Sequence, residues 1–234
     1  MPTVVFANPK GGAGKSTSAV ILATQLASKG AAVTIVDADP NKPVSQWAKR
    51  GVPPKMTVLA ELSEETIIDA IDEAAEKTPF VVVDLEGTAS LMVGYAISRA
   101  DLVIIPIQGS QLDAAQATKA IALIKQQERA LKRTIPYMIL FTRTNPALRP
   151  RTLLHIQEEF KKHGIRAFKT QIHEREAYRA LFSFGGTLET LEAKQVGGLD
   201  KAIANAREFA AEVIASLRPA EIETTRKAAG AKHG

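Results

Sequence analysis

The sequence predicts an α/β fold, a doubly wound and mostly parallel sheet with helices on both faces. Three observations support this fold class. Short apolar runs rich in β-branched residues recur along the chain, stretches with helical spacing separate them, and the turn after the first run is rich in glycine. Because the runs are too continuous for strands with one solvent-facing side, they indicate strands buried on both faces.

Five of these runs are expected to form strands, at residues 3–8, 32–37, 80–84, 102–107 and 137–141. Helical spacing bounded by Gly, Pro or capping residues predicts helices at residues 16–29, 64–76, 112–133 and 151–163. A last helix over residues 199–217 carries an apolar stripe, which favours packing on the sheet over binding to a membrane surface. A strand, a helix and another strand form the repeating unit of a doubly wound domain.

The length of 234 residues, without a long linker, predicts one domain over residues 1–218. The basic segment 219–234 has little to bury, so we expect a disordered C-terminal tail. The chain contains no cysteine, which excludes disulfides, thiolate zinc sites and cysteine-ligated iron–sulfur clusters. No apolar stretch approaches the roughly 20 residues of a membrane-spanning helix, and the N-terminus does not read as a signal peptide. We therefore expect a soluble, cytoplasmic protein.

Charge is unevenly distributed along the chain. The net charge is +5, but residues 1–118 hold 9 Lys and Arg against 13 Asp and Glu, a balance of −4, and residues 119–234 hold 21 against 12, a balance of +9. A basic second half suits a polyanionic partner, although an ordinary solvated surface explains the charge equally well.

The glycine-rich segment at residues 8–17 reads NPKGGAGKST and lies between the first expected strand and the first expected helix. This is the context of a phosphate-binding loop (P-loop), whose backbone amides converge on a nucleotide phosphate at a helix N-terminus. Lys15 would neutralise the β- and γ-phosphates, Ser16 would offer its hydroxyl to Mg²⁺, and Thr17 would donate near the α-phosphate. The expected nucleotide-binding residues here are Lys10, Gly11, Gly12, Ala13, Gly14, Lys15, Ser16 and Thr17.

A second lysine, Lys10, precedes the glycines of this loop. From that position its side chain does not easily reach a γ-phosphate held by its own loop. We therefore consider that it serves a nucleotide bound to another molecule.

The third expected strand ends in Asp84, as a Walker B strand does. Its carboxylate would accept hydrogen bonds from Mg²⁺-bound water or from Ser16. Two residues later, Glu86 adds another carboxylate that could move the attacking water, repel the nucleotide or point outward, so its role stays open. Gly87 permits a mobile switch loop.

With these motifs, the chain resembles the ParA/MinD group of deviant Walker A ATPases, and within it the small ParF-like plasmid partition ParA proteins. The loop of that group reads Lys-Gly-Gly-x-Gly-Lys-Ser/Thr. The resemblance covers about residues 2–217. It also rests on Asn8-Pro9, Asp37-Ala38-Asp39-Pro40 followed by Trp47, and residues 102–106 followed by Leu112-Asp113. Glu86 departs from the pattern, because members of the group usually place small residues or proline after the Walker B aspartate.

The resemblance implies ATP and Mg²⁺ as cofactors and assigns roles to two further carboxylates. Asp39 would orient the attacking water and Asp37 would help to arrange the surroundings of the metal, although either could instead cap the next helix. Strand alternation sends both side chains to the same side of the sheet. The expected catalytic residues are Lys10, acting across a dimer, Lys15 and Asp39, and the expected metal-site residues are Ser16, Asp37 and Asp84.

The resemblance further implies a weak ATPase that forms an ATP-dependent sandwich dimer, binds nonspecific DNA on the nucleoid and segregates or positions plasmid DNA. A centromere-binding, ParB-type partner would stimulate hydrolysis, and no membrane would be involved. The alternatives are an accessory ATPase for conjugative DNA transfer or protein-cluster positioning, a MinD-like membrane-positioning ATPase, and a P-loop metabolic ligase.

Cations gather after the fifth expected strand, but no base-reading module is visible there. Sequence-independent contact with DNA phosphates is the role that such a cluster favours. The candidate DNA-binding residues are Arg149, Arg151, Lys169, Arg175 and Arg179. Thr142 and Arg143 could lie beside the adenine or ribose, and Arg143 could contact DNA instead. Related proteins place a loop and helix near the base where residues 171–178 lie in this chain.

Overall fold

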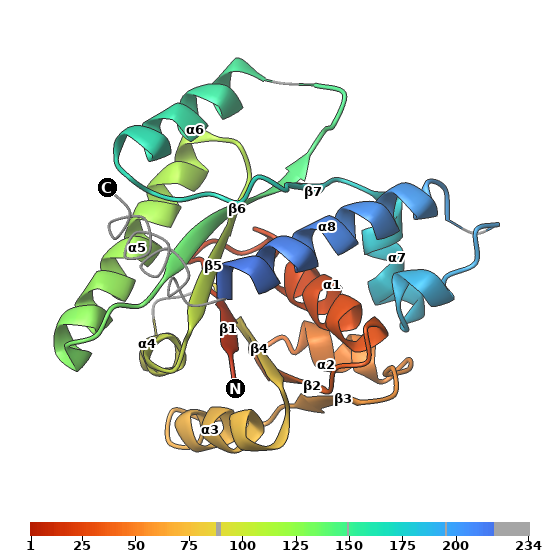
Figure 1. Ribbon diagram of the computed structural model, residues 1–234, viewed down its shortest axis with the longest axis horizontal. Helices are drawn as coiled ribbons and strands as arrows, with labels where there is room; N and C mark the ends of the chain where they lie inside the picture. Colours follow the sequence, from red (N-terminus) through yellow and green to blue (C-terminus); the bar gives the residue numbers. More distant parts are fainter. Residues whose placement is uncertain (88–89, 149, 195, 218–234) are drawn as a thin grey trace, which may run out of the picture.

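Seven parallel strands form one sheet in the computed structural model, which describes residues 1–87, 90–148, 150–194 and 196–217 (Figure 1). Across the sheet the strands follow the order β3-β2-β4-β1-β5-β6-β7, and every strand pairing among the described residues is parallel. Their bounds are β1 (Thr3–Phe6), β2 (Val33–Ala38), β3 (Met56–Leu59), β4 (Phe80–Leu85), β5 (Leu102–Ile107), β6 (Tyr137–Thr144) and β7 (Ile172–His173). The predicted fold class is therefore confirmed.

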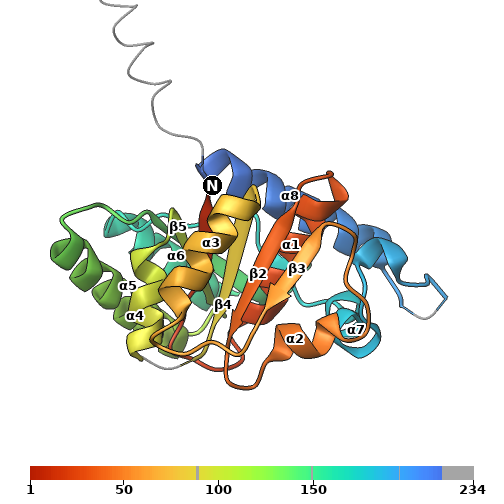
Figure 2. The same cartoon turned by 90° about the horizontal axis from the view of Figure 1, so that it is seen from below.

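Helices cover both faces of this sheet (Figure 2). One layer consists of α1 (Lys15–Ser28), α2 (Pro43–Ala48), α7 (Glu176–Phe184) and α8 (Leu199–Leu217), with a short 3-10 turn, η1 (Leu188–Thr190). The other layer consists of α3 (Ile67–Lys77), α4 (Leu91–Ser98), α5 (Gln111–Leu131) and α6 (Arg151–Lys162). None of the helices that the structure describes is long and apolar enough to cross a membrane.

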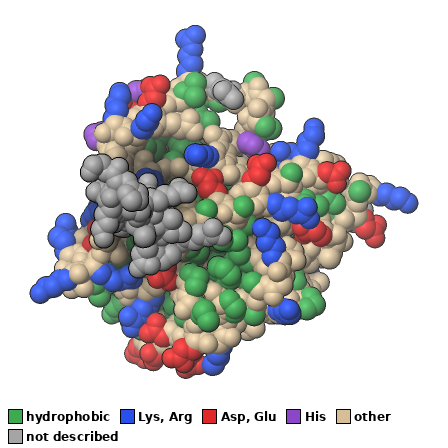
Figure 3. All heavy atoms as spheres, in the orientation of Figure 1, with side chains coloured by type: hydrophobic (Ala, Val, Ile, Leu, Met, Phe, Trp, Pro, Cys, Tyr) green, Lys and Arg blue, Asp and Glu red, His purple; other side chains and the backbone are tan. Residues whose placement is uncertain are grey.

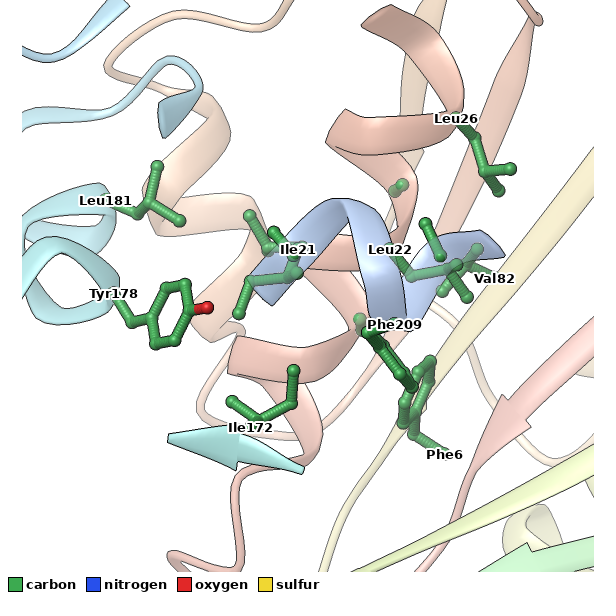
Figure 4. Packing of buried hydrophobic residues seen from close by; sticks show 14 of the residues in the cluster. Phe6, Ile21, Leu22, Leu26, Val82, Ile172, Tyr178, Leu181 and Phe209 are labelled. Carbon is green, nitrogen blue, oxygen red and sulfur yellow. The ribbon is translucent and has the colours of Figure 1, made fainter. Parts of the chain in front are cut away.

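Alternating strand residues feed two separate cores. In β1, Val4 and Phe6 pack towards the layer of α1 and α8, whereas Val5 packs towards the layer of α3 to α6. Because successive side chains of a strand point to opposite faces, a strand covered on both sides is apolar throughout. Figure 4 shows the first core, in which Ile21 and Leu22 of α1 lie among side chains from the sheet, α7 and α8.

The five predicted strands and five predicted helices are present, with ends that differ by up to three residues. The prediction missed the elements β3, β7, α2, α4 and α7, although residues 171–178 were expected to include a loop and helix. These elements contain two to nine residues, so each offers few positions for a periodic pattern, and β3 also lies half-exposed at the edge of the sheet. The tail expected over residues 219–234 lies outside the described residues.

The strand order brings the carboxyl ends of β2, β4 and β1 together. In the paired strands Asp37 lies opposite Asp84, and Asp84 lies opposite Phe6. Ligands of open parallel sheets bind at this end, where connections diverge to either side. The fold therefore places two carboxylates next to the glycine-rich loop that follows β1.

A contact between α2 and the end of α7 holds the loop after β2 against the rest of the layer. Trp47 of α2 is fully buried, and its Nε1 donates to the carbonyl of Gly186 at 3.0 Å. Gly185 has φ +79°, and a Cβ there would lie 2.5 Å from the Cβ of Arg50 and 2.9 Å from its backbone carbon. Glycine is required at this close approach, because a side chain would push the two segments apart.

Replacing Trp47 by Phe should lower the free energy of unfolding by about 1–3 kcal/mol, because the carbonyl of Gly186 would lose its buried partner. Urea denaturation followed by circular dichroism measures the loss. Tyr95→Phe, at a side chain of α4 that is 36% exposed, should change stability by less than about 0.5 kcal/mol. Equal stability of Trp47→Phe and the wild type would contradict the structural importance of this contact.

Candidate nucleotide-binding site

The loop between β1 and α1 has the backbone shape that its glycines allow. Gly12 and Gly14 have φ of +72° and +98°, in the left-handed region that residues with a Cβ rarely adopt. Gly14 is the N-cap of α1, and the first turn of that helix begins with Lys15. Unpaired amides at a helix N-terminus attract anions, so the loop and helix together form a phosphate-binding geometry.

A hollow of about 350 Å³ opens over this loop. It brings together residues from the loop, from the segment after β2, from the segment after β4 and from the end of β6. The lining residues are Gly11, Gly12, Gly14, Lys15, Ser16, Thr17, Asp39, Pro40, Asn41, Glu86, Gly87 and Arg143. Most of the residues expected to hold phosphate thus surround one space, while Ala13 is buried behind it.

Lys15 is 5% exposed, and its ammonium has only long contacts with the protein. Its Nζ lies 3.3 Å from the carbonyl oxygens of Asn8 and Lys10. Burial lowers the pKa of Lys15, and the nearby carboxylates of Asp84, Asp39 and Glu86 partly oppose that decrease. A phosphate in the hollow would supply the negative charge and short hydrogen bonds that this buried ammonium lacks.

Asp84 is fully buried at the end of β4, and neither of its carboxylate oxygens has a hydrogen-bond partner. Burial raises its pKa to about 7. The Ser16 hydroxyl faces Asp84 and opposes this rise, although it does not reach hydrogen-bonding geometry with either oxygen. Mg²⁺ commonly takes one or two protein ligands and completes its shell with water and substrate phosphates. The unpartnered carboxylate beside a serine hydroxyl fits such an ion, held through Ser16 and a water on Asp84.

The two carboxylates that follow β2 have different environments. Asp37 is buried, and its Oδ2 accepts hydrogen bonds from the backbone N–H and hydroxyl of Ser45 at 2.7 and 2.6 Å. Asp37 therefore holds the first turn of α2, and burial raises its pKa. Its Oδ1 has no partner. Asp39 lines the hollow, and its Oδ1 accepts from the backbone N–H and the side-chain amide of Asn41 at 2.8 and 3.0 Å.

Lys10 does not line the phosphate hollow, because its side chain is held elsewhere. Its Nζ pairs with Oδ1 of Asp113 at 2.6 Å, and that aspartate is 1% exposed. The other oxygen of Asp113 accepts from the Ser110 hydroxyl at the start of α5. The Lys10 side chain itself remains 38% exposed. A charge pair between a buried carboxylate and an accessible lysine can exchange partners when a stronger anion arrives.

Thr142 lies behind the loop instead of facing the phosphate hollow. Its hydroxyl is 2.7 Å from the carbonyl oxygen of Ala13 and 3.1 Å from that of Ile107. A Cβ at Gly14 would lie 3.3 Å from the Thr142 side chain. Thr142 therefore supports the loop from β6. Its side chain lies so close to Gly14 that position 14 accommodates only a small residue.

A second hollow of about 280 Å³ adjoins the first and shares Gly14, Thr17 and Arg143 with it. It is bounded by β6, β7 and α7, and its further lining residues are Ser18, Thr142, Ile172, His173, Glu174, Arg175, Tyr178, Arg179 and Phe182. Tyr178 and Ile172 contribute apolar surface, as a site for a purine ring requires. Of these residues, sequence reasoning named only Thr142, Arg143 and the segment 171–178 for the base.

The candidate DNA-binding residues do not gather in one place. Arg175 and Arg179 line the second hollow, and Arg179 pairs with Glu174 and Glu176 at 2.5 and 2.9 Å. Arg151 is exposed at the start of α6, and Lys169 lies next to the C-terminal part of α8, where its backbone N–H donates to Glu212 at 2.8 Å. Arg149 lies outside the described residues.

Comparison with known proteins gives matches over nearly the whole chain. The profile of the VirC1 protein family matches residues 1–218. The chain is 42% identical over 221 residues to Protein ParA of Rhizobium radiobacter, and this match covers 94% of this chain and 99% of that protein. It is 32% identical over 187 residues to the maintenance of carboxysome distribution protein A of Gloeobacter kilaueensis, covering 76% of this chain and 82% of the relative.

A solved structure shares the fold. The complex of a Cyanothece McdA variant with ATP has a TM-score of 0.67 and 18% sequence identity, and the match covers 88% of this chain and 96% of that one. At this identity the likeness concerns the fold alone.

Asp84→Asn should reduce the loss of stability that the metal-free protein undergoes as pH rises. The pKa of Asp84 is raised by burial to about 7, so between its ordinary value near 4 and pH 7 the folded state binds more protons than the unfolded state. Stability must therefore fall as pH increases through this window, and Asp37 adds a contribution of the same sign.

Thermal unfolding between pH 4 and 8 with EDTA measures this effect. Comparison of Asp84→Asn with the wild type measures the contribution of Asp84 together with its repulsion with Asp37. If the unfolding temperatures of the two proteins change with pH in parallel, Asp84 does not have the raised pKa on which this prediction depends.

Proposed function

Because the chain belongs to the VirC1 protein family and is a ParA/MinD-type ATPase, we propose that it binds MgATP in the hollow over the loop and hydrolyses it slowly. ATP brings two copies together, the ATP-bound dimer binds DNA without sequence specificity, and a ParB-type centromere-binding partner stimulates hydrolysis. The output is segregation or positioning of plasmid DNA in the cytoplasm, on the nucleoid and without a membrane. Protein ParA of Rhizobium radiobacter, 42% identical over almost the full length of both chains, supports this role.

The observation that carries the proposal is the different placement of the two lysines of the loop. Lys15 is buried inside the phosphate hollow, whereas Lys10 is directed to Asp113 outside it and stays partly exposed. A γ-phosphate held by the loop can therefore be met by its own Lys15 and by the Lys10 of a second copy. Dimerisation then depends on Lys10 leaving Asp113, so that ATP and the second subunit together complete the site.

In the proposed reaction, water attacks the γ-phosphorus in line with the bond to ADP. Asp39 orients this water, while Lys15 and the loop amides stabilise charge on the phosphate oxygens. Mg²⁺, held through Ser16 and the carboxylates of Asp84 and Asp37, supplies further charge neutralisation when it is bound. Thr17 completes the donors near the α-phosphate, and Arg143 lies beside the base or ribose.

DNA binding in the proposal is electrostatic and distributed over the molecule. On the face seen in Figure 3, the Lys and Arg side chains of the described residues are spread over the face and its outline and are interspersed with acidic ones. Arg151 and Lys169 are accessible for phosphate contact, and the residues after position 118 carry a charge balance of +9. Two copies joined by ATP would double the number of contacts, which makes affinity depend on nucleotide state.

A second candidate is positioning of a protein cluster rather than of a plasmid. The 32% identity to the maintenance of carboxysome distribution protein A of Gloeobacter kilaueensis favours it. An accessory role in conjugative DNA transfer uses the same ATP cycle. In each case the ATPase and DNA-binding steps are the same and only the cargo differs. Identifying the partner protein therefore distinguishes these candidate functions.

Asp39→Ala should form a stable dimer with MgATP, because this change removes the water-orienting carboxylate but leaves the phosphate contacts intact. Lys15→Ala should stay monomeric because the phosphates lose their buried cation, and Lys10→Ala should bind ATP without dimerising. Light scattering after size exclusion, together with titration of a fluorescent ATP analogue, measures both properties. Lys77→Ala, at an exposed ion pair on α3, is the matched control. A wild type that binds ATP and stays monomeric when hydrolysis is blocked would rule out the switch.

DNA binding should require ATP and should weaken steeply with salt. Fluorescence anisotropy of a labelled random duplex should show tight binding with ATP for the wild type and for Asp39→Ala. Binding should be weak for the wild type with ADP or without nucleotide, and for Lys15→Ala with ATP. The logarithm of the affinity should fall linearly with the logarithm of salt concentration, because binding releases counterions. Arg151→Ala with Lys169→Ala should reduce this slope. Equal affinity in all nucleotide states would contradict the proposed cycle.

A further inference from the structure

Glu86 lies between two hollows, and the established features of the site give it no task. It follows β4, two residues after Asp84, and its side chain is partly buried. It lines the phosphate hollow, and it also lines a separate hollow of about 310 Å³. The further lining residues of this separate hollow are Ala7, Asn8, Pro9, Gly87, Val93, Ile97, Gln116, Lys119, Ala120 and Leu123.

The backbone next to Glu86 is fixed close to the P-loop. A Cβ at Gly87 would lie 3.0 Å from the backbone nitrogen of Gly11 and 3.2 Å from the backbone carbon of Lys10. Such contacts with backbone atoms cannot be relieved by a side-chain rotation. The chain therefore passes directly against the start of the phosphate-binding loop, and Glu86 is placed at the rim of the phosphate hollow by this close packing.

The two hollows offer a carboxylate different surroundings. The separate hollow is mostly apolar, with Val93, Ile97 and Leu123 among its walls and Lys119 at an exposed position. A carboxylate loses hydration in apolar surroundings, so the polar phosphate hollow is the favourable side for its charge. There Lys15 is near enough for the Glu86 charge to raise its pKa against the effect of burial.

Glu86 also has capacity to bind a hydrogen-bond donor. Among the described residues it takes part in no ion pair. Asp39 keeps only its Oδ2 for such a donor, because its Oδ1 already accepts from the backbone N–H and the side-chain amide of Asn41. A triphosphate brings only acceptors to this rim and engages the cations of the hollow, Lys15 and Arg143, so water is a donor that remains for a carboxylate next to it.

We propose that Glu86 is a further catalytic residue of the hydrolysis reaction, a second carboxylate that orients the attacking water together with Asp39. This inference rests on the proposed ATPase function. Glu86 accepts a hydrogen bond from the water and thereby directs a lone pair of the water oxygen towards the γ-phosphorus. The oxygen–phosphorus bond forms as the bond to the bridging oxygen breaks, and ADP leaves with that electron pair. One proton of the water passes to an oxygen of the γ-phosphate and the other stays on the attacking oxygen, so Glu86 takes up no proton in this step.

The test compares turnover with nucleotide affinity in Glu86→Gln and Glu86→Ala. Loss of a hydrogen bond to a charged group should lower kcat of Glu86→Ala about tenfold to a hundredfold, with a smaller decrease for Glu86→Gln, which keeps an acceptor oxygen. The Kd for a fluorescent ATP analogue should stay within about threefold of the wild type or decrease, because a negative charge next to the phosphates has been removed. Multiple-turnover phosphate release gives kcat, and titration gives Kd.

Two control variants make the outcome specific. Glu73→Gln removes a carboxylate from an exposed ion pair on α3 and should leave both quantities unchanged. Lys119→Gln should leave kcat unchanged, because Glu86 acts towards the phosphate hollow. A decrease in Lys119→Gln equal to that of Glu86→Gln would overturn the inference, since it would show that the carboxylate works through the other hollow.

The remaining outcomes separate the inference from the function on which it rests. If the wild type hydrolyses ATP and Glu86→Ala has the same kcat, the inference is wrong and the ATPase function stands. If kcat and nucleotide affinity of Glu86→Ala fall together, Glu86 shapes the loop and is not a water ligand. If the wild type has no ATPase activity, the proposed function and this inference fail together.

Discussion

The structure depends on keeping charged groups buried where three parallel strands end. Lys15, Asp37 and Asp84 are each at most 5% exposed, and each lacks at least some of the partners that a buried charge requires. Burying a charge without a partner is costly, so these groups carry unfavourable electrostatic energy that a phosphate and a metal ion can relieve. The two apolar cores on either side of the sheet supply the stability that offsets this unfavourable energy.

The sheet makes this arrangement possible because Asp37 and Asp84 lie near the ends of neighbouring strands and Lys15 begins the helix that follows β1. The register of β2 and β4 sets Asp37 opposite Asp84, and the loop after β1 places Lys15 over them. A parallel sheet covered on both faces has little freedom at its centre, so the side chains at its carboxyl edge are preorganised. Binding a phosphate then requires small movements, and the energy of binding remains available for the dimerisation that we propose.

The sequence was sufficient for the central strands, the long helices and the phosphate-binding loop. These features have strong local signals, such as apolar runs, helical periodicity and glycines at fixed spacing. Sequence reasoning did not find that Lys10 would pair with Asp113, because 103 positions separate them and only the fold brings β1 and α5 together. Thr142 lines the second hollow, as a place near the base requires, but sequence reasoning did not find that its hydroxyl also supports the loop, because that contact depends on the register of β6. The second hollow also depends on α7, a helix of nine residues, and on β7, a strand of two.

The contact between Trp47 and Gly186 joins the element that follows Asp39 to the end of the helix whose side chains line the second hollow. Since the chain contains one tryptophan, the tryptophan fluorescence of the unlabelled protein, excited beyond the absorption of its tyrosines, comes from a single indole at this junction. Its emission depends on the surroundings of both α2 and α7. The molecule therefore contains its own optical probe of movement between the second hollow and the phosphate hollow.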